Sequence, residues 1–118
     1  MDEALRTSTI VPFRGTVTVS YSDAIIASSK DAKVLSTPGK EAVFFLPFED
    51  IYFDFLTLTR QTRPTGYGSA AYWRVNAVGE AADNFMWSYE AADGADHLLL
   101  ERHAAFDPTK ARIEAVPA

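Results

Sequence analysis

The chain has 118 residues, of which 47% are hydrophobic, contains no cysteine and carries a formal net charge of −5. A chain of this length suits one domain that buries roughly two thirds of its unfolded surface, and the absence of cysteine excludes disulfides, thiolate zinc sites and cysteine nucleophiles. The acidic balance and the lack of any apolar run near the roughly 20 residues that span a bilayer disfavour nucleic acid and membranes as partners, so we expect a soluble, cytoplasmic protein.

The first clear element is a strand with regular alternation. Residues 16–21 alternate between apolar and polar side chains, which predicts a half-buried strand. Ser22-Asp23 suits a tight turn, and the short apolar run 24–27 follows it. These segments together predict an antiparallel hairpin.

The middle of the chain predicts further strands and one loop. Residues 33–37 lead into a turn at Pro38-Gly39, and the run 42–46 is apolar on both faces, which predicts a central strand. The β-branched and aromatic residues of 51–59 favour another strand. Residues 60–69 contain proline and two glycines without a periodic pattern, so we expect the longest exposed loop there.

A second hairpin is expected from residues 70–77 and 84–90, with 78–80 as a slightly long connection. If odd residues of one strand face odd residues of the other, the first face carries mainly large apolar groups, namely Trp73, Val75, Phe85, Trp87 and Tyr89. The opposite face then carries a mixed set, namely Tyr72, Arg74, Asn76, Asn84, Met86 and Ser88. The first face is expected to be core and the second a solvated surface or the wall of a shallow cleft.

The last part of the chain predicts one short helix and the closing strands. Asp93 and Asp96 suit the start of a helix that continues to about residue 101. Residues 104–106 and 110–116 then complete the sheet.

Together these elements predict the fold class. We expect a mainly β, single compact antiparallel domain, barrel-like or tent-like, with at most one or two short helices. The domain should span residues 1–118, with an ordered core at about 15–116 and a flexible segment at 1–10.

Several segments, in this order and spacing, resemble a known family. They are Ala27-Ser28-Ser29, Thr37-Pro38-Gly39 ahead of Val43–Ile51, Gly68–Trp73, Asn84–Tyr89 and His103–Phe106. The set resembles the domain of unknown function 427 family, small all-β proteins that are sometimes labelled nucleotidyltransferase-like. The resemblance implies a fold similar to the β-tent of zinc-binding chaperone-like and methionine-sulfoxide-reductase-like domains.

The chain departs from the family pattern in one segment. Members carry Cys-Pro-Tyr-Lys-Gly where this chain has Pro64-Thr65-Gly66-Tyr67-Gly68. No role of the family cysteine or lysine therefore carries over to this protein. The related folds bind zinc through cysteine pairs. This chain has no cysteine, so we expect no metal and no cofactor here.

The main candidate site is a cleft on the second hairpin. Aromatic walls with a few polar groups are typical of small-ligand sites. The candidate ligand-binding residues are Tyr72, Trp73, Arg74, Asn84, Trp87 and Tyr89. The alternative is that these aromatic side chains are simply core.

Three other groups of residues are weaker candidates for a site. Arg60, Arg63, Gly66 and Gly68 form a weak candidate anion site, with a charged loop as the alternative. The adjacent acids Glu49 and Asp50 suit a turn better than a metal or a general base. His97 and His103 lack a third ligand for zinc.

The sequence does not determine the function. The leading hypothesis is a domain that binds an unknown small molecule or protein in a shallow aromatic and polar cleft. The alternatives are a nucleotidyltransferase-like enzyme and a regulatory module that pairs through a sheet edge. Whether the protein is an enzyme stays open, and we expect a monomer or a weak homodimer.

Overall fold

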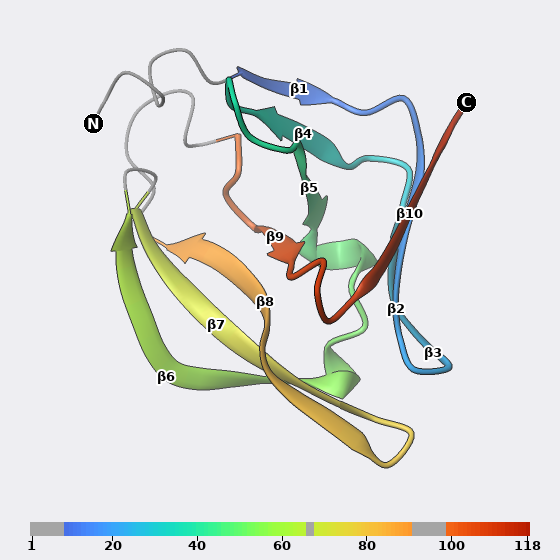
Figure 1. Ribbon diagram of the computed structural model, residues 1–118, viewed down its shortest axis with the longest axis vertical. Helices are drawn as coiled ribbons and strands as arrows, with labels where there is room; N and C mark the ends of the chain where they lie inside the picture. The colour runs from blue at the N-terminus through green and yellow to red at the C-terminus, as the bar shows by residue number, and fades with distance from the viewer. Residues whose placement is uncertain (1–8, 66–67, 91–98) are drawn as a thin grey trace.

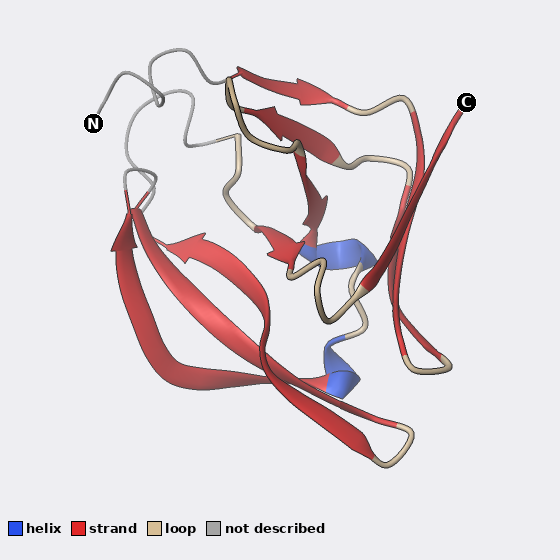
Figure 2. Cartoon of the chain, in the orientation of Figure 1, coloured by secondary structure: helices blue, strands red, loops and turns tan. Residues whose placement is uncertain are grey.

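Two antiparallel sheets form the part of the chain that the structure describes, which is residues 9–65, 68–90 and 99–118 of a computed structural model. The elements run in the order β1 (Thr9–Pro12), β2 (Gly15–Tyr21), β3 (Ala24–Ser29), β4 (Lys33–Ser36), β5 (Val43–Pro47), η1 (Phe48–Asp50), η2 (Phe53–Phe55), β6 (Leu56–Thr65), β7 (Gly68–Ala77), β8 (Glu80–Glu90), β9 (His103–Phe106) and β10 (Arg112–Pro117). The helices η1 and η2 are single 3-10 turns, and the described residues contain no α-helix (Figure 2).

The larger sheet has seven strands in the order β1-β4-β5-β9-β8-β7-β6, and the smaller has three in the order β10-β2-β3. In Figure 1 the smaller sheet stands on the right, β1, β4 and β5 lie at the top, and β6, β7 and β8 lie at the lower left. The sheets are not closed into a barrel. The prediction of a mainly β antiparallel domain with no more than two short helices is therefore confirmed; the helix expected at 93–101 lies largely outside the described residues.

The core lies between the two sheets. The smaller sheet contributes the fully buried side chains of Val17, Val19 and Ile26. The larger sheet contributes Leu46 and Met86 to the same cluster. Burial of a side chain of this size stabilises the fold by about 1.5–3 kcal/mol, so these contacts hold the two sheets together.

The predicted first hairpin is confirmed. β2 and β3 pair antiparallel around Ser22, which has a φ of 54°. The alternation of β2 buries Val17 and Val19 completely, as the sequence pattern indicates. Strand β10 adds to the other side of β2 and completes the three-stranded sheet.

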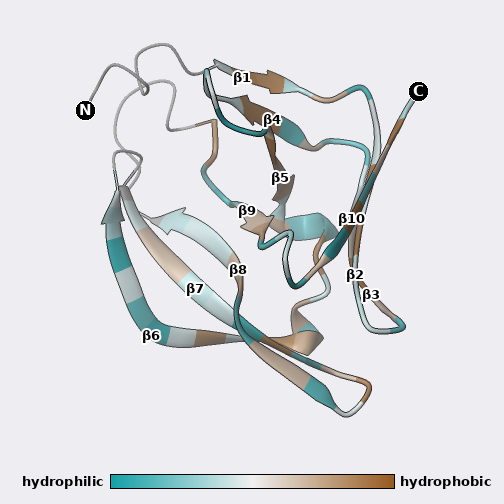
Figure 3. Ribbon diagram, viewed as in Figure 1, coloured by the Kyte–Doolittle hydropathy of each residue, from teal (hydrophilic) through white to brown (hydrophobic). Residues whose placement is uncertain are grey.

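The prediction of a loop at residues 60–69 is wrong. β6 continues to Thr65 and pairs with β7, which begins at Gly68; Gly66 lies outside the described residues. β6 is an edge strand, so Pro64 is tolerated although it has no N–H to donate. Figure 3 shows that β6 is mainly hydrophilic, while β5 and β9 are apolar. The strand expected at 51–59 likewise begins only at Leu56, after η2.

The register predicted for the second hairpin is also wrong. β7 and β8 are joined by two residues, Val78 and Gly79, and both have positive φ values, as a tight type I′ turn requires. Ala77 consequently faces Glu80, and odd residues of β7 face even residues of β8. The connection predicted at residues 78–80 is one residue too long. A shift of one residue in register moves the side chains of one strand to the opposite face of the sheet.

No helix among the described residues is long and apolar enough to cross a membrane.

Candidate functional site

A cavity of about 340 Å³ opens beside the β7–β8 hairpin. Its wall includes Tyr72 of β7 and Trp87 and Tyr89 of β8, together with Asn84 at a bulge in β8. These are four of the predicted cleft residues. The remaining wall residues are Arg63, Thr65, Ala70 and Asp107.

The observed register places the aromatic wall on one face of the sheet. Tyr72 lies directly opposite Trp87, and Ala70 lies directly opposite Tyr89. Cross-strand partners point to the same side of a sheet, so these side chains share a face. The methyl group of Ala70 leaves space between the larger rings, which gives the wall its hollow shape.

Contacts around the cavity fix the orientation of the rings. The Trp87 indole Nε1 donates a hydrogen bond to the Tyr89 hydroxyl at 3.3 Å. The buried ring of Phe45 lies edge-on to Trp87, with centroids 6.4 Å apart, and 5.7 Å from the Tyr89 ring. Such aromatic contacts contribute about 0.5–1.5 kcal/mol each beyond area burial, so the wall is pre-organised.

Asn84 is a wall residue with an unusual backbone conformation. Its φ is 54°, and it lies where the β7–β8 register shifts between Trp73 and Val75. Asparagine tolerates this left-handed conformation better than other non-glycine residues. The Asn84 Oδ1 atom is buried and accepts no hydrogen bond from any residue that the structure describes.

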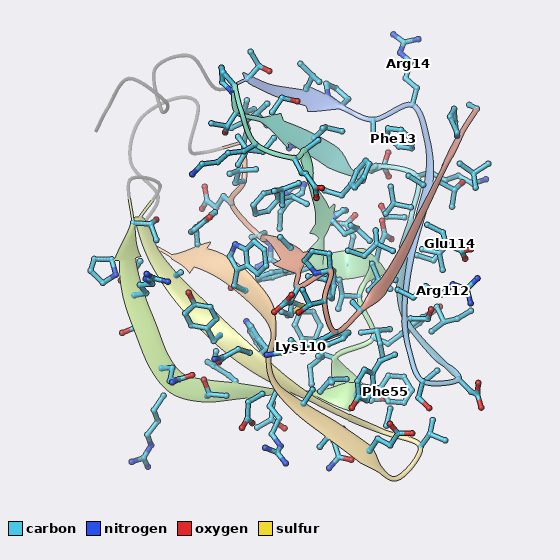
Figure 4. The ribbon with its side chains drawn as sticks, viewed as in Figure 1. Phe13, Arg14, Phe55, Lys110, Arg112 and Glu114 are labelled. Carbon is cyan, nitrogen blue, oxygen red and sulfur yellow. The ribbon has the colours of Figure 1, made fainter. Side chains whose placement is uncertain are left out.

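Asp107 reaches the cavity from the turn after β9. The Asp107 N–H donates to the Phe85 carbonyl at 2.9 Å, and Lys110 Nζ donates to the Asp83 carbonyl at 2.7 Å, so two hydrogen bonds hold this turn against the bulge of β8. Figure 4 shows the Lys110 side chain beside β8. The Asp107 Oδ1 atom accepts hydrogen bonds from the backbone N–H and hydroxyl of Thr109 at 2.9 and 2.7 Å.

The Asp107 carboxyl group is ionised at neutral pH. Partial burial raises the pKa of Asp107, but the two hydrogen bonds from Thr109 and the charge of Lys110 outweigh it, and the net pKa is lowered. Asp107 therefore supplies a fixed negative charge at the cavity rim.

Two of the predicted cleft residues do not line the cavity. Trp73 lies opposite Met86 on the other face, where its Nε1 donates to Ser88 Oγ at 3.3 Å and its ring packs 5.2 Å from Phe53. The exposed side chain of Arg74 forms an ion pair with Asp83. The sequence pattern places Trp73 and Trp87 on the same face because it predicts the wrong register between β7 and β8.

Asp107 is the residue that the sequence analysis did not assign to a site. Its segment, Asp107-Pro108-Thr109, is typical of a turn between strands and gives no indication of a binding site. Asp107 reaches the cavity because β9, which precedes it in the chain, pairs with β8. No local sequence pattern predicts this pairing. Of the predicted anion group, Arg63 lines the cavity, while Arg60 does not.

A smaller cavity of about 200 Å³ adjoins the same indole. It shares Trp87 with the larger cavity and is walled mainly by apolar side chains, namely Val43, Phe44, Phe106, Pro108 and Ile113, with Glu41 and Ala42 completing it. Pro108 follows Asp107 in the chain, so one turn lines both cavities.

Comparison with known protein families identifies the family of the chain. The family model described as Domain of unknown function (DUF427) matches residues 9–117. The chain belongs to this family. A search of curated proteins finds no match to it. The matched region of the DUF427 domain runs from β1 to β10 and contains every residue of both cavities.

The other titratable candidates of the DUF427 domain lie outside these two cavities. Asp50 accepts a hydrogen bond from Ser29 Oγ at 2.5 Å. Glu49 and His103 border a separate polar cavity of about 370 Å³ with Lys30 and Lys33. His97 lies outside the described residues, and within the described ones no three His, Asp or Glu side chains are grouped as metal ligands would be.

His103 is held by its own turn. Its Nδ1 lies 2.8 Å from the Glu101 carbonyl oxygen, which assigns the ring proton to Nδ1. Burial lowers the pKa of His103 below its ordinary value, and Lys33 lowers it further, while the Glu101 carbonyl and Glu49 act in the opposite direction. His103 is therefore mostly neutral at pH 7.

Proposed function

We propose that this DUF427 domain binds a small organic molecule in the cavity beside the β7–β8 hairpin. A volume of about 340 Å³ lies within the usual range of ligand pockets. The walls combine flat aromatic surfaces, which bury apolar area, with a few polar groups that orient a ligand.

The observation that carries the proposal is an aromatic wall that also holds two charged residues. Tyr72, Trp87 and Tyr89 share one face of the sheet, and Arg63 and Asp107 line the same cavity. A ligand with a flat apolar part and a polar group would contact both kinds of side chain, whereas a purely apolar molecule would contact only the rings.

The test is a fragment screen read by thermal shift on the wild type and two tyrosine variants. Fragments that bind the folded state raise Tm, and the shift grows with the logarithm of the ratio of fragment concentration to Kd. Tyr72→Ala removes a wall of the cavity and should abolish the shift. Tyr52→Ala is the matched control, because Tyr52 is 57% exposed and takes no part in the cavity. Fragments that stabilise Tyr72→Ala as well as the wild type would contradict the proposal, as would a screen without any hit.

A further inference from the structure

The cavity carries two opposite charges that do not neutralise each other. Arg63 lies in the wall and forms no ion pair with any described residue, whereas the charge partner of Asp107 is Lys110. Lys110 Nζ donates to the Asp83 carbonyl and lies 3.8 Å from Asp107 Oδ2, which is too far for a hydrogen bond. Asp107 Oδ2 therefore has no hydrogen-bond donor among the described residues.

The polar atoms of the cavity fit the two ends of a zwitterion. A guanidinium group such as that of Arg63 binds a carboxylate through two parallel N–H bonds. An ammonium group has three donors, and the Asp107 carboxylate belongs to the same wall. An amine without a carboxylate would leave the Arg63 charge uncompensated, because Arg63 forms no ion pair with any described residue.

The neighbouring apolar cavity indicates what else the ligand carries. Its volume of about 200 Å³ is bordered by Phe44, Phe106 and Ile113, and it meets the larger cavity at Trp87. A side chain that passes the edge of this indole would bury apolar surface, which stabilises binding by roughly 25 cal/mol per Å².

We infer that the ligand is a zwitterionic α-amino acid with a large apolar side chain. Its carboxylate binds Arg63, its ammonium group binds Asp107, and its side chain enters the apolar cavity past Trp87. This inference rests on the proposed function and adds the chemical class of the ligand.

The first experiment compares four probes by calorimetric titration. L-Phenylalanine carries both charges and an aromatic side chain. 2-Phenylethylamine lacks the carboxylate, 3-phenylpropanoate lacks the ammonium group, and glycine lacks the side chain. L-Phenylalanine should bind more tightly than each of the others by roughly tenfold to a hundredfold, because each loses a charge-assisted hydrogen bond or the apolar contact.

The second experiment assigns the carboxylate to Arg63. In Arg63→Gln the affinity for L-phenylalanine should fall to that of 2-phenylethylamine, while the affinity for 2-phenylethylamine itself should stay unchanged. Arg60→Gln is the matched control: Arg60 lies on the same exposed strand, outside the cavity wall, and its loss should leave all affinities unchanged. Equal losses in both variants would overturn the inference.

The outcomes separate the ligand class from the proposed function. If 2-phenylethylamine or 3-phenylpropanoate binds as tightly as L-phenylalanine, the zwitterion is wrong and small-molecule binding stands. If none of the four probes binds while fragments still stabilise the protein through Tyr72, the ligand class is again wrong alone. If neither probes nor fragments bind, both the inference and the proposed function are overturned.

Discussion

Asn84 combines a left-handed backbone conformation with a buried oxygen that accepts no hydrogen bond from any described residue. Asn84→Gly keeps the backbone free to adopt a positive φ, whereas Asn84→Ala forces a Cβ-bearing residue into it. We expect the glycine variant to be more stable than the alanine variant by about 1 kcal/mol in urea unfolding, because a non-glycine residue loses this free energy in the left-handed region. An alanine variant as stable as the glycine variant would show that the positive φ at position 84 does not affect stability.

His103 predicts a pH dependence of stability. The pKa of His103 is lowered in the folded state, so the unfolded chain takes up a proton first as the pH falls. The free energy of unfolding should therefore decrease as the pH falls below about 6.5, and it should be unaffected by His103 above pH 7. His103→Gln should reduce the difference in urea midpoint between pH 7 and pH 5. An unchanged difference would exclude His103 as its source.

At the scale of elements, the β7–β8 turn is the clearest point of strain. Val78 has a φ of 55° and is exposed, although β-branched residues are outliers in this conformation. Val78→Asn should raise the stability by about 1 kcal/mol, since Asn-Gly is the preferred sequence for such turns. The urea midpoint measures this change.

Gly79→Ala provides the contrast for the same turn. Gly79 has a φ of 76° and open space where a Cβ would lie, so the substitution tests conformation without a clash. It should lower the stability by about 1 kcal/mol. A stabilised Gly79→Ala together with an unchanged Val78→Asn would contradict the account of the turn.

Individual strands were predictable because the information lies in neighbouring residues. The alternation of β2 and the apolar run of β5 both agree with the observed burial. The pairing register of β7 and β8 was not predictable, because it depends on whether two or three residues form the turn. The extension of β6 to Thr65 was also missed, since pairing with β7 outweighs the proline and glycine signals nearby.

The candidate site was predictable to the extent that it lies in one hairpin. Tyr72, Trp87 and Tyr89 are brought together by the pairing of β7 with β8. Asp107 joins them only through the pairing of β8 with β9 and through the turn contacts on the bulge. Such long-range contacts leave no periodic signal in the sequence.

At the scale of the whole molecule, the exposed edge of β6 bears on the alternative of pairing through a sheet edge. The strand carries Arg60 within an irregular stretch and Pro64 near its end, and charge, bulges and proline all oppose pairing with another chain. We predict that the wild type is monomeric in sedimentation velocity and that Arg60→Val with Pro64→Val self-associates with increasing concentration. Arg60→Lys with Pro64→Lys, which keeps the edge charged, is the control. A wild-type dimer that the lysine variant dissociates would favour the pairing module instead.

The nucleotidyltransferase-like alternative stays a prediction of the resemblance. Thermal shift with nucleotides and Mg²⁺ tests it, because ligands of the folded state raise Tm. An absence of stabilisation at high nucleotide concentration would count against it.

The chain contains two tryptophans, Trp73 and Trp87, which lie on opposite faces of the same hairpin. The most direct measurement of the central claim is therefore an NMR titration of their indole N–H signals with a fragment hit or L-phenylalanine. Binding in the cavity should shift the Trp87 signal in a saturable way and leave the Trp73 signal nearly unchanged. A saturable shift of Trp73 alone, or none at either indole, would contradict the account.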